Sequence, residues 1–545
     1  MKNPVHTTPI RIAAAWLAVA LATQTPAATF TVVNTTGIGP GSLDAAIQAA
    51  NANPGPDVIE FAIPPFDGTV KTIAQTNNLT DITGPVLIDG YSQPGSSPNS
   101  LAIGHNAVIL IQINHTQPGL ALAGGGSTVR GLILNGAGSM VFITSTSNVV
   151  EGCFIGTDAS GTTNGLPVTS TGVLVQSSAN RIGGSTPAQR NLIGGCNTQG
   201  IHFSGGGASN NVVQGNYIGT DRSGTNRVGN ALGVAVTSAS FNIIGGDTVE
   251  KRNLISGNGS GVQLSGAGGN NVVAGNLIGT DSTGTRALPN TTGVSVSNQT
   301  NLIGGVTAII GAPPGNVIAG NSGDGISLGG GSRHLVAGNY IGTDSTGLMD
   351  LGNAGRGILL NVPDTLITNN VISGNNQDGI ITTGSSGSRN TIVDNFIGTD
   401  MSGTRNISNN LFGIRNGGGF GNILRHNVIA FNGEHGVFHT GASSTNNTIS
   451  ANAIYSNTKL GINLGGGIEA SNGVSSNDSC DVDAALANFG QNHPILHSAT
   501  GGLAGATISG VLPSAPSQSY RLEFFINTAC DPSQHGEGEY YLGHT

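Results

Sequence analysis

Apolar residues along this chain occur in short clusters, and each cluster is bounded by Gly or Asn. Residues 261–281, G-V-Q-L-S-G-A-G-G-N-N-V-V-A-G-N-L-I-G-T-D, hold three such clusters: V-Q-L, V-V-A and L-I-G-T. Clusters this short, bounded by turn residues, are typical of strands rather than helices. Three strands and three bends would make one coil, and the same plan recurs along most of the sequence.

The repeat is marked by a Gly followed by Val or Ile, which opens the first strand of each coil. These positions are Gly172, Gly200, Gly233, Gly261, Gly293, Gly325, Gly357, Gly379, Gly413, Gly436 and Gly461. Leucine-rich repeats would show L-x-x-L-x-L spacing, and propeller blades would show a longer four-stranded period. Neither pattern is present, so the sequence predicts an all-β parallel β-helix in which each coil stacks on the one before.

Asparagine recurs at two bends of the coil. Asn adopts the left-handed conformation of a sharp bend readily, and amides stacked about 4.8 Å apart can hydrogen-bond to each other. We expect one file at the start of the third strand: Cys153, Asn191, Asn216, Asn253, Asn276, Asn316, Asn339, Asn370, Asn395, Asn427 and Asn452. We expect a second file five residues earlier, made of Asn148, Asn211, Asn271, His334, Thr365, Asn390, Asn422 and Asn447, and in three longer coils Asn180, Asn242 and Asn301 fill the same place.

A third file is predicted at the end of the third strand, where Asp and Asn alternate. Its expected members are Asp158, Cys196, Asp221, Asn258, Asp281, Asn321, Asp344, Asn375, Asp400, Asn432 and Asn457. Carboxylates on adjacent coils would repel each other, and an intervening amide would double their separation and offer each a donor. This alternation would also explain a larger repeat of two coils.

The ends of the chain depart from the repeat. Lys2, Arg11 and the apolar run 12–22 are typical of a secretory signal, with a short buried helix as the alternative. Ser42 can cap a helix whose apolar positions Leu43, Ala46, Ile47 and Ala50 share one face, and this helix would cover the open end of the solenoid. Strands are expected at 29–33, 57–61 and 86–90.

Four segments follow from this pattern. We expect a signal peptide at 1–28, a cap with the first rungs at 29–104, the β-helix at 105–479 and a separate β module at 480–545. That last segment holds about four strands with antiparallel alternation, fewer than an immunoglobulin-like sandwich needs. It would form a small, incomplete sandwich, from a truncated gene or completed by a partner, or instead a small sheet packed on the last coil.

Three stretches resemble one known group of proteins. The opening F-T-V-V-N-T-T-G-I-G-P-G-S-L-D-A-A-I, the repeats N-x-I-G-T-D-x-S-G-T and the end F-F-I-N-T-A-C-D-P-S-Q-H-G-E-G-E-Y-Y-L-G are similar to bacterial exported CSLREA-type proteins. Gly41 stands where that motif has Cys, and Asp44-Ala45 where it has Arg-Glu. The resemblance implies a right-handed parallel β-helix of the pectin-lyase-like superfamily, in which catalytic members act on polysaccharides.

Composition narrows the possible partners. Charged residues make up 9% of the chain and the net charge is −9, so a nucleic-acid-binding surface is not expected. The apolar run near the N-terminus is too short to span a bilayer, and no later segment is longer. Cys153 and Cys196 are expected as separate buried thiols, whereas Cys480 and Cys530 could form a disulfide.

A catalytic site should stand out as carboxylates on the outer face of a sheet. The residues expected to point outward on the first strand are Leu174, His202, Ala235, Gln263, Ser295, Ser327, Leu359, Ile381, Arg415, Phe438 and Asn463. None is a carboxylate, whereas glycoside hydrolysis needs two. The best remaining group of side chains is Arg415, Arg425, His426, Glu434, His435 and His439, from which Glu434, His435 and His439 are weak catalytic candidates, with a solvated face as the alternative.

The five D-x-[ST]-G turns that begin at Asp158, Asp221, Asp281, Asp344 and Asp400 are weak calcium candidates. The other interpretation is a structural turn in which the carboxylate accepts backbone N–H groups. No other cofactor is indicated. The sequence therefore favours a secreted or cell-surface, non-catalytic, adhesin-like scaffold that binds a polysaccharide or a cell-surface glycan. A polysaccharide lyase or glycoside hydrolase is the alternative.

Overall fold

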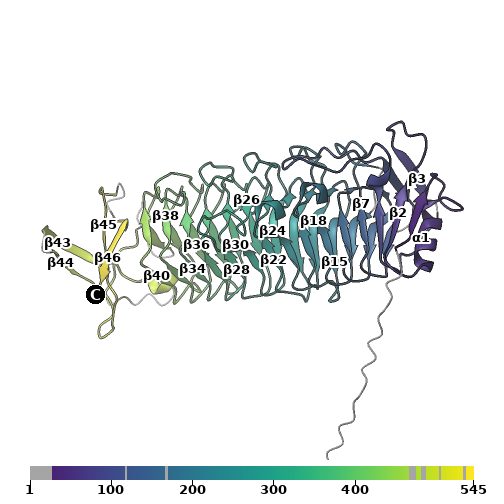
Figure 1. Ribbon diagram of the computed structural model, residues 1–545. Helices are drawn as coiled ribbons and strands as arrows, with labels where there is room; N and C mark the ends of the chain where they lie inside the picture. Colours follow the sequence, from purple (N-terminus) through teal and green to yellow (C-terminus); the bar gives the residue numbers. More distant parts are fainter. Residues whose placement is uncertain are drawn as a thin grey trace, which may run out of the picture.

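The computed structural model describes residues 27–545 except 76, 117–118, 166–169, 466–473, 480, 482–485, 503–504 and 532–534. Three long parallel sheets, which we name A, B and C, run the length of a solenoid (Figure 1). One coil passes through a strand of C, then A, then B, as in β21, β22 and β23. The predicted parallel β-helix is therefore confirmed. Most of the predicted signal peptide and Cys480 lie outside the described residues.

Sheet A has 15 strands: β1 (Thr29–Val32), β2 (Asp57–Phe61), β4 (Val86–Asp89), β7 (Thr128–Arg130), β10 (Val149–Glu151), β13 (Arg181–Gly183), β16 (Val212–Gln214), β19 (Ile243–Gly245), β22 (Val272–Ala274), β25 (Leu302–Gly304), β28 (Leu335–Ala337), β31 (Leu366–Thr368), β34 (Thr391–Val393), β37 (Ile423–Arg425) and β40 (Thr448–Ser450). Sheet B has 14: β3 (Lys71–Gln75), β5 (Ile111–His115), β8 (Ile133–Gly136), β11 (Phe154–Ile155), β14 (Leu192–Ile193), β17 (Tyr217–Ile218), β20 (Leu254–Ile255), β23 (Leu277–Ile278), β26 (Val317–Ile318), β29 (Tyr340–Ile341), β32 (Val371–Ile372), β35 (Phe396–Ile397), β38 (Val428–Ala430) and β41 (Ala453–Tyr455).

Sheet C has 13 strands: β6 (Leu120–Leu122), β9 (Gly138–Ile143), β12 (Ser170–Val175), β15 (Gln199–Ser204), β18 (Leu232–Thr237), β21 (Ser260–Ser265), β24 (Thr292–Val296), β27 (Ile326–Leu328), β30 (Ile358–Leu360), β33 (Ile380–Thr383), β36 (Ile414–Gly417), β39 (Val437–His439) and β42 (Ile462–Leu464). Inward-facing residues from all three sheets, such as Val262, Val273 and Ile278, are fully buried and form one continuous core.

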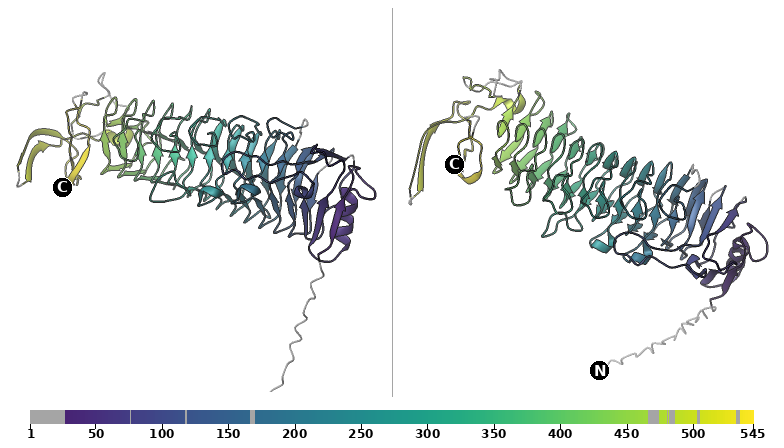
Figure 2. Two further views of the ribbon diagram at one scale, coloured as in Figure 1. Left: turned by 45° about the horizontal axis from the view of Figure 1, so that its top comes forward. Right: turned by 90° about the horizontal axis from the view of Figure 1, so that it is seen from above.

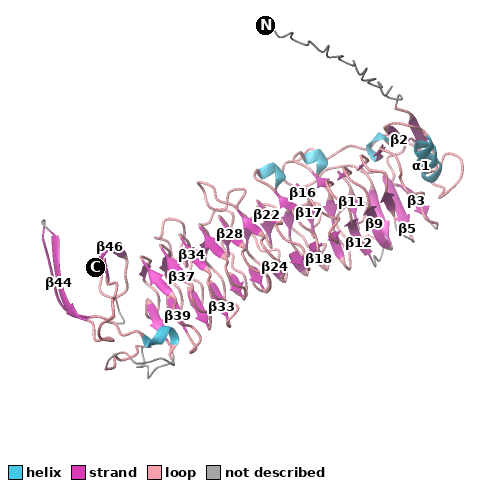
Figure 3. Cartoon of the chain, turned by 90° about the horizontal axis from the view of Figure 1, so that it is seen from below, coloured by secondary structure: helices cyan, strands magenta, loops and turns pink. Residues whose placement is uncertain are grey.

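The helix α1 (Leu43–Ala52) covers the N-terminal end, as predicted (Figure 1). Ser42 accepts a hydrogen bond from the Ala45 N–H at 3.2 Å, and Leu43, Ala46 and Ile47 are buried against the first strands. Short 3-10 helices occur at η1 (Gly90–Ser92), η2 (Pro187–Gln189), η3 (Val249–Lys251) and η4 (Ala487–Gly490). Figure 3 shows them as cyan turns along the solenoid. Among the described residues, no helix is long and apolar enough to cross a membrane.

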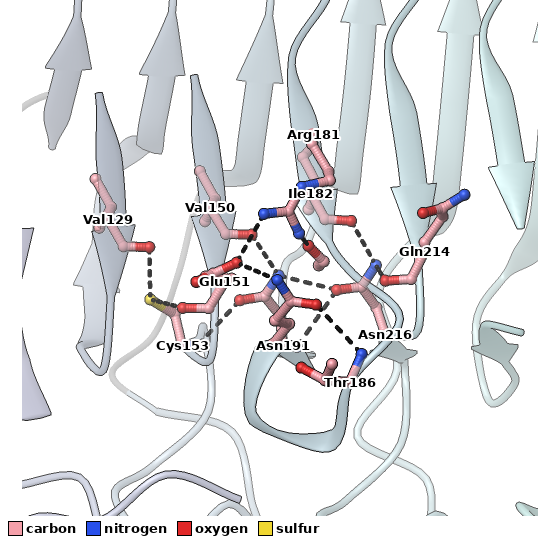
Figure 4. Close-up of polar contacts among 12 residues, drawn as sticks. Val129, Val150, Glu151, Cys153, Arg181, Ile182, Thr186, Asn191, Gln214 and Asn216 are labelled. Atoms are coloured by element: carbon pink, nitrogen blue, oxygen red, sulfur yellow. Dashed lines mark hydrogen bonds and ion pairs between the residues drawn. The ribbon is translucent and has the colours of Figure 1, made fainter. Parts of the chain in front are cut away.

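Two of the predicted amide files are confirmed. In the first, each Asn side chain oxygen accepts from the coil before and each Nδ2 donates to the coil after, at 2.9–3.4 Å for Asn216, Asn253, Asn276 and Asn316. Figure 4 shows the start of this file at Cys153, Asn191 and Asn216. The Cys153 thiol donates to the Glu151 carbonyl at 3.3 Å, in place of the amide.

The third file exists but its predicted members are partly wrong. It lies at the bend before sheet C and consists of Cys196, Asn230, Asn258, Asn290, Asn321, Asn353, Asn375, Asn409, Asn432 and Asn457. The predicted aspartates are not in it. A file member must accept and donate, whereas a carboxylate has no donor. The two-coil repeat comes instead from a loop inserted after each of these aspartates.

Each of these inserted loops, which we call flaps, spans 157–164, 220–227, 280–287, 343–350 or 399–406 and is closed by an antiparallel bridge between its ends. The flaps lie over outward-facing apolar residues of sheet B, which form a second buried cluster that includes Phe154, Leu192, Leu254 and Leu277. Successive flaps also touch each other, since the Ser282 N–H donates to the Gly224 carbonyl at 3.0 Å.

In the described part of the C-terminal module, the strands do not form one sandwich. This part consists of two separate antiparallel pairs, β43 (Ile495–Gly502) with β44 (Gly505–Val511) and β45 (Glu523–Ile526) with β46 (Tyr540–His544), which lie beyond the last coil (Figure 2). Two of its side chains continue the amide files. Asn488 Oδ1 accepts the Asn447 N–H at 2.8 Å, and Glu537 Oε1 accepts from Asn457 Nδ2 at 3.1 Å.

Candidate functional site

The outer face of sheet C carries side chains in straight files, one per coil. The residues predicted to point outward are in register from Leu174 to Asn463, as expected. A second outward file precedes the coil glycines: Thr171, Gln199, Leu232, Ser260, Thr292, Asp324, Arg356, Asp378, Phe412, His435 and Leu460. The middle of the face is therefore rich in hydroxyl and amide groups.

Toward the C-terminal end this face becomes charged. Arg415 Nη2 lies 2.9 Å from Asp378 Oδ2, and Arg356 Nη1 lies 3.5 Å from Asp324 Oδ2. The Asp378 side chain is fully buried, whereas the two arginines are about one-third exposed. Burial raises the pKa of Asp378, and the nearby charges of Arg415 and Arg356 oppose this increase. Each guanidinium has five N–H donors, so donors remain for a ligand.

Aromatic rings adjoin these charges. Phe412 and Phe438 are stacked with ring centroids 4.8 Å apart, and the Arg415 guanidinium lies 5.5 Å from the Phe412 centroid. His435 stacks on both phenylalanines at 5.7–5.9 Å. We call Asp324, Arg356, Asp378, Phe412, Arg415 and Phe438 the charged-aromatic cluster. It combines planar apolar surface with guanidinium donors on a rigid sheet.

The structure brings together only part of the group that the sequence suggested. Glu434 lies at the edge of this face and forms an ion pair with Lys459. His435 is buried, and its Nδ1 accepts the Leu460 N–H at 3.0 Å while its Nε2 lies 3.0 Å from Asn463 Nδ2. Both ring nitrogens are thus engaged in local contacts.

The other basic residues of that group lie elsewhere. His439 faces the interior and is fully buried, with Nδ1 3.2 Å from Ser444 Oγ, and burial lowers its pKa to about 4. This position keeps His439 away from any ligand on the outer face. Arg425 ends β37 on sheet A, and the exposed His426 lies 3.9 Å from Asp394.

The five candidate calcium aspartates begin the flaps. Asp281 Oδ1 accepts the N–H groups of Thr285 and Arg286 at 3.1 and 3.3 Å and the Thr283 hydroxyl at 2.8 Å. The same contacts recur in the flaps of Asp158, Asp221, Asp344 and Asp400. Although burial raises the pKa of Asp221, hydrogen bonds from Asn226, Ser223 and Thr225 outweigh it and hold the pKa below its usual value.

Calcium binding at the flaps stays a prediction. An ion there would have to compete with these hydrogen bonds for the carboxylate oxygens. The part of the chain that the structure describes contains no group of three or more His, Cys, Asp or Glu side chains that could hold a metal ion. What the aspartates do in the structure is fold the flaps.

Sequence reasoning missed Asp324 and Asp378, which are two carboxylates on the outer face. It considered only the residue after each Val or Ile, whereas the residue before each coil Gly also faces outward. The D-G-I motif at Asp324 and Asp378 was the available signal. Asn230, Asn290, Asn353 and Asn409 could have been found by counting back three or four residues from the next coil Gly.

A family model described as "Right handed beta helix region" matches residues 314–480. No curated relative matches the sequence. Among solved structures, the Dettilon tailspike protein gp208 has 13% identity and a TM-score of 0.39, covering 88% of this chain and 75% of that chain. The A-module of Azotobacter vinelandii mannuronan C-5 epimerase AlgE4 has 14% identity and a TM-score of 0.30, with coverages of 80% and 98%.

The alginate lyase AlyF-OU02 is also similar, with 12% identity, a TM-score of 0.36 and coverages of 82% of this chain and 91% of that chain. Likeness at this level does not reveal what the present chain binds.

Proposed function

We propose that this right-handed parallel β-helix binds an extended polysaccharide along the outer face of sheet C and does not cleave it. The observation that carries the proposal is the composition of that face. Gln263, Ser295 and Ser327 lie on consecutive coils about 4.8 Å apart, His202 lies two coils before them, and the charged-aromatic cluster lies on later coils. Sugars present hydroxyls and apolar C–H faces, which such a surface can match.

The carboxylates of this face are poorly suited to catalysis. Glycoside hydrolysis requires one carboxyl to protonate the leaving group while a second activates water or attacks the sugar. Asp378 is fully buried beside Arg415, and Asp324 is paired with Arg356. Neither is free to take such a role in this arrangement, so the scaffold function is favoured over a hydrolase or lyase.

We also propose that the protein is exported and acts outside the cell. The N-terminal sequence and the CSLREA-type resemblance support export, after which the protein would act as an adhesin-like scaffold on a cell-surface or extracellular glycan. The rigid stack of coils presents the binding groups at fixed spacing, so little ordering of the protein is needed when a polymer binds.

Binding can be tested with a matched pair of double variants. Arg415→Met with Asp378→Asn removes the central ion pair of the cluster without leaving a buried charge unpaired. We expect it to weaken the retardation of the protein in affinity gels containing a bound polysaccharide by tenfold or more. The control is Arg130→Met with Asp89→Asn, which removes a similar pair, 2.7 Å apart, on sheet A. Equal losses in both variants, or none in either, would contradict the proposed face.

A further inference from the structure

We propose that two copies of this chain associate through the outer face of sheet A. An outward file on this sheet is aliphatic over most of its length. Its members, in register, are Val149, Arg181, Val212, Ile243, Val272, Leu302, Leu335, Leu366, Thr391 and Ile423. We call this file the aliphatic stripe.

The stripe faces solvent. Ile243 and Leu366 are 37% exposed and Ile423 is 42% exposed, although each lies between neighbouring strands of the same sheet. Phe241, at the bend just before β19, is 55% exposed and adds aromatic surface beside the stripe. Contiguous apolar surface of this kind marks an interaction site more often than scattered exposed residues do.

Strand propensity alone does not explain the stripe. β-Branched residues favour strands on any sheet, so propensity should enrich both outer faces equally. The equivalent file on sheet C instead carries Gln263, Ser295 and Ser327 in three of the coils where sheet A carries Val272, Leu302 and Leu335. In these three coils the two faces therefore differ, whereas Leu359 and Ile381 make the next two coils of sheet C apolar as well.

A second copy of the chain fits the geometry of the stripe. The ten strands from β10 to β37 extend over about 43 Å at the usual strand spacing, and the three residues of each strand with one bend residue on either side add about 16 Å. The resulting area of roughly 700 Å² per copy is close to the roughly 800 Å² per partner of a stable interface. Another solenoid presents the same file at the same spacing, and a two-fold axis lets each stripe cover the other.

Charged residues lie beside the stripe at the bends before β28, β31 and β34: Arg333, Asp364 and Arg389. Arg389 Nε lies 2.8 Å from Asp364 Oδ1, so these two charges compensate each other. The one charged member of the stripe is Arg181, whose Nη2 lies 2.9 Å from Glu151 Oε2 of the same sheet. Figure 4 draws this pair. Pairing through sheet A would leave both C faces exposed. A dimer could then hold one polysaccharide at two places, which raises avidity without any new contact.

The mass of the full chain in solution tests this inference. We expect sedimentation velocity to give twice the mass of one chain at the upper end of a concentration series. Ile243→Lys with Leu302→Lys should give a monomer, since two buried charges would oppose the interface. Ser295→Lys with Ser327→Lys adds the same charge on sheet C and should leave the dimer intact.

Thermal melting of both variants checks that the fold is preserved. If the lysine variant unfolds, the milder pair Ile243→Thr with Leu302→Asn replaces it, and association should weaken by tenfold or more. A wild-type chain that is monomeric throughout, a larger oligomer, or a dimer unaffected by the stripe substitutions would overturn the inference. Because this readout needs no polysaccharide, it is independent of the proposed function.

Discussion

Asparagine suits the three bends because its short side chain both accepts and donates hydrogen bonds. An Asn in a file accepts a backbone N–H from the coil before it, and its amide N–H groups donate to nearby oxygens, which are those of the next coil in the first and third files. Asn316, for example, accepts from the Asn276 N–H at 2.9 Å and donates to Asn339 Oδ1 at 2.9 Å, with no exposed surface. The files satisfy buried backbone groups that the bends would otherwise leave unpaired.

Replacing Asn316 with Ala should therefore destabilise the middle of the solenoid by about 2–4 kcal/mol, since more than one buried polar group loses its partner. The exposed Asn376 is the matched control, and Asn376→Ala should change the free energy of unfolding by less than about 0.5 kcal/mol. Chemical denaturation of both variants measures the difference. Equal stability of the two would show that the file contributes nothing.

Asp281 offers a second test at this scale, because it separates the structural turn from a calcium site. Asp281→Asn keeps the oxygen that accepts the Thr285 and Arg286 N–H groups, whereas Asp281→Ala removes it. We expect hydrogen exchange at these two amides to be little changed in the Asn variant and at least tenfold faster in the Ala variant. If calcium held the flap, adding a chelator to the wild type would accelerate exchange as much as the Ala substitution.

At the scale of elements, the flaps explain why coils come in pairs. Each flap reaches across to the flap two coils away, and together they cover the outer row of sheet B. Close packing requires glycine at the flap tips: Gly284 has a φ of +74°, and a Cβ there would lie 2.6 Å from Ser345 Cβ. No flap lies over Ile243 on sheet A, which is 37% exposed, or over Gln263 on sheet C, which is partly exposed, among the described residues.

Comparing Gly284→Ala with Gly205→Ala should separate two contributions to the loss of stability: the steric clash of the new Cβ and the strain of a positive φ. Gly205 has a similar φ of +83° with nothing within 4 Å of its would-be Cβ, so Gly205→Ala carries the conformational cost alone. We expect Gly205→Ala to cost about 1 kcal/mol and Gly284→Ala about 1–3 kcal/mol more, because Ser345 must move. Denaturation curves that coincide for the two variants would rule out close flap packing.

The elements show where sequence reasoning works. Coil glycines and two asparagine files could be aligned from sequence because a solenoid repeats the same local demand in every coil. The third file was misassigned because an insertion separates Asp281 from the true bend residue Asn290, and spacing alone does not reveal which of two polar residues is buried. The charged-aromatic cluster was missed because the bend before each strand of sheet C turns the side chain that precedes the coil Gly, such as Asp378, toward the outer face. Strand alternation alone does not predict this direction.

At the scale of the whole molecule, the two ends of the solenoid are closed in different ways. The helix α1 covers the first coil with apolar side chains. At the last coil, Asn488 and Glu537 accept the hydrogen bonds that the asparagines of a further coil would accept. Burial, with the nearby Asp531 carboxyl as a smaller cause, raises the pKa of Glu537 to about 7 from its ordinary 4.5.

This shift predicts that the C-terminal closure weakens as pH rises. Since the pKa of Glu537 is higher in the folded state, its contribution to stability is fully present below pH 4.5 and is lost progressively as pH rises to about 7. The protection of the Gly538 amide from hydrogen exchange, measured relative to the intrinsic exchange rate at each pH, should fall over this range in the wild type, where this amide donates to the Ile454 carbonyl. The Glu537→Gln variant keeps an acceptor for Asn457 but cannot ionise. Its protection of the Gly538 amide should therefore equal that of the wild type at low pH and exceed it near pH 7.

The central claim is that sheet C holds a polysaccharide and leaves it intact. It is tested most directly by incubating the full chain with a panel of polysaccharides and measuring both the amount bound and the length distribution of the polymer. We predict that at least one polysaccharide is retained and that its length distribution does not change. A polymer that is shortened, or a panel from which none is retained, would contradict the claim.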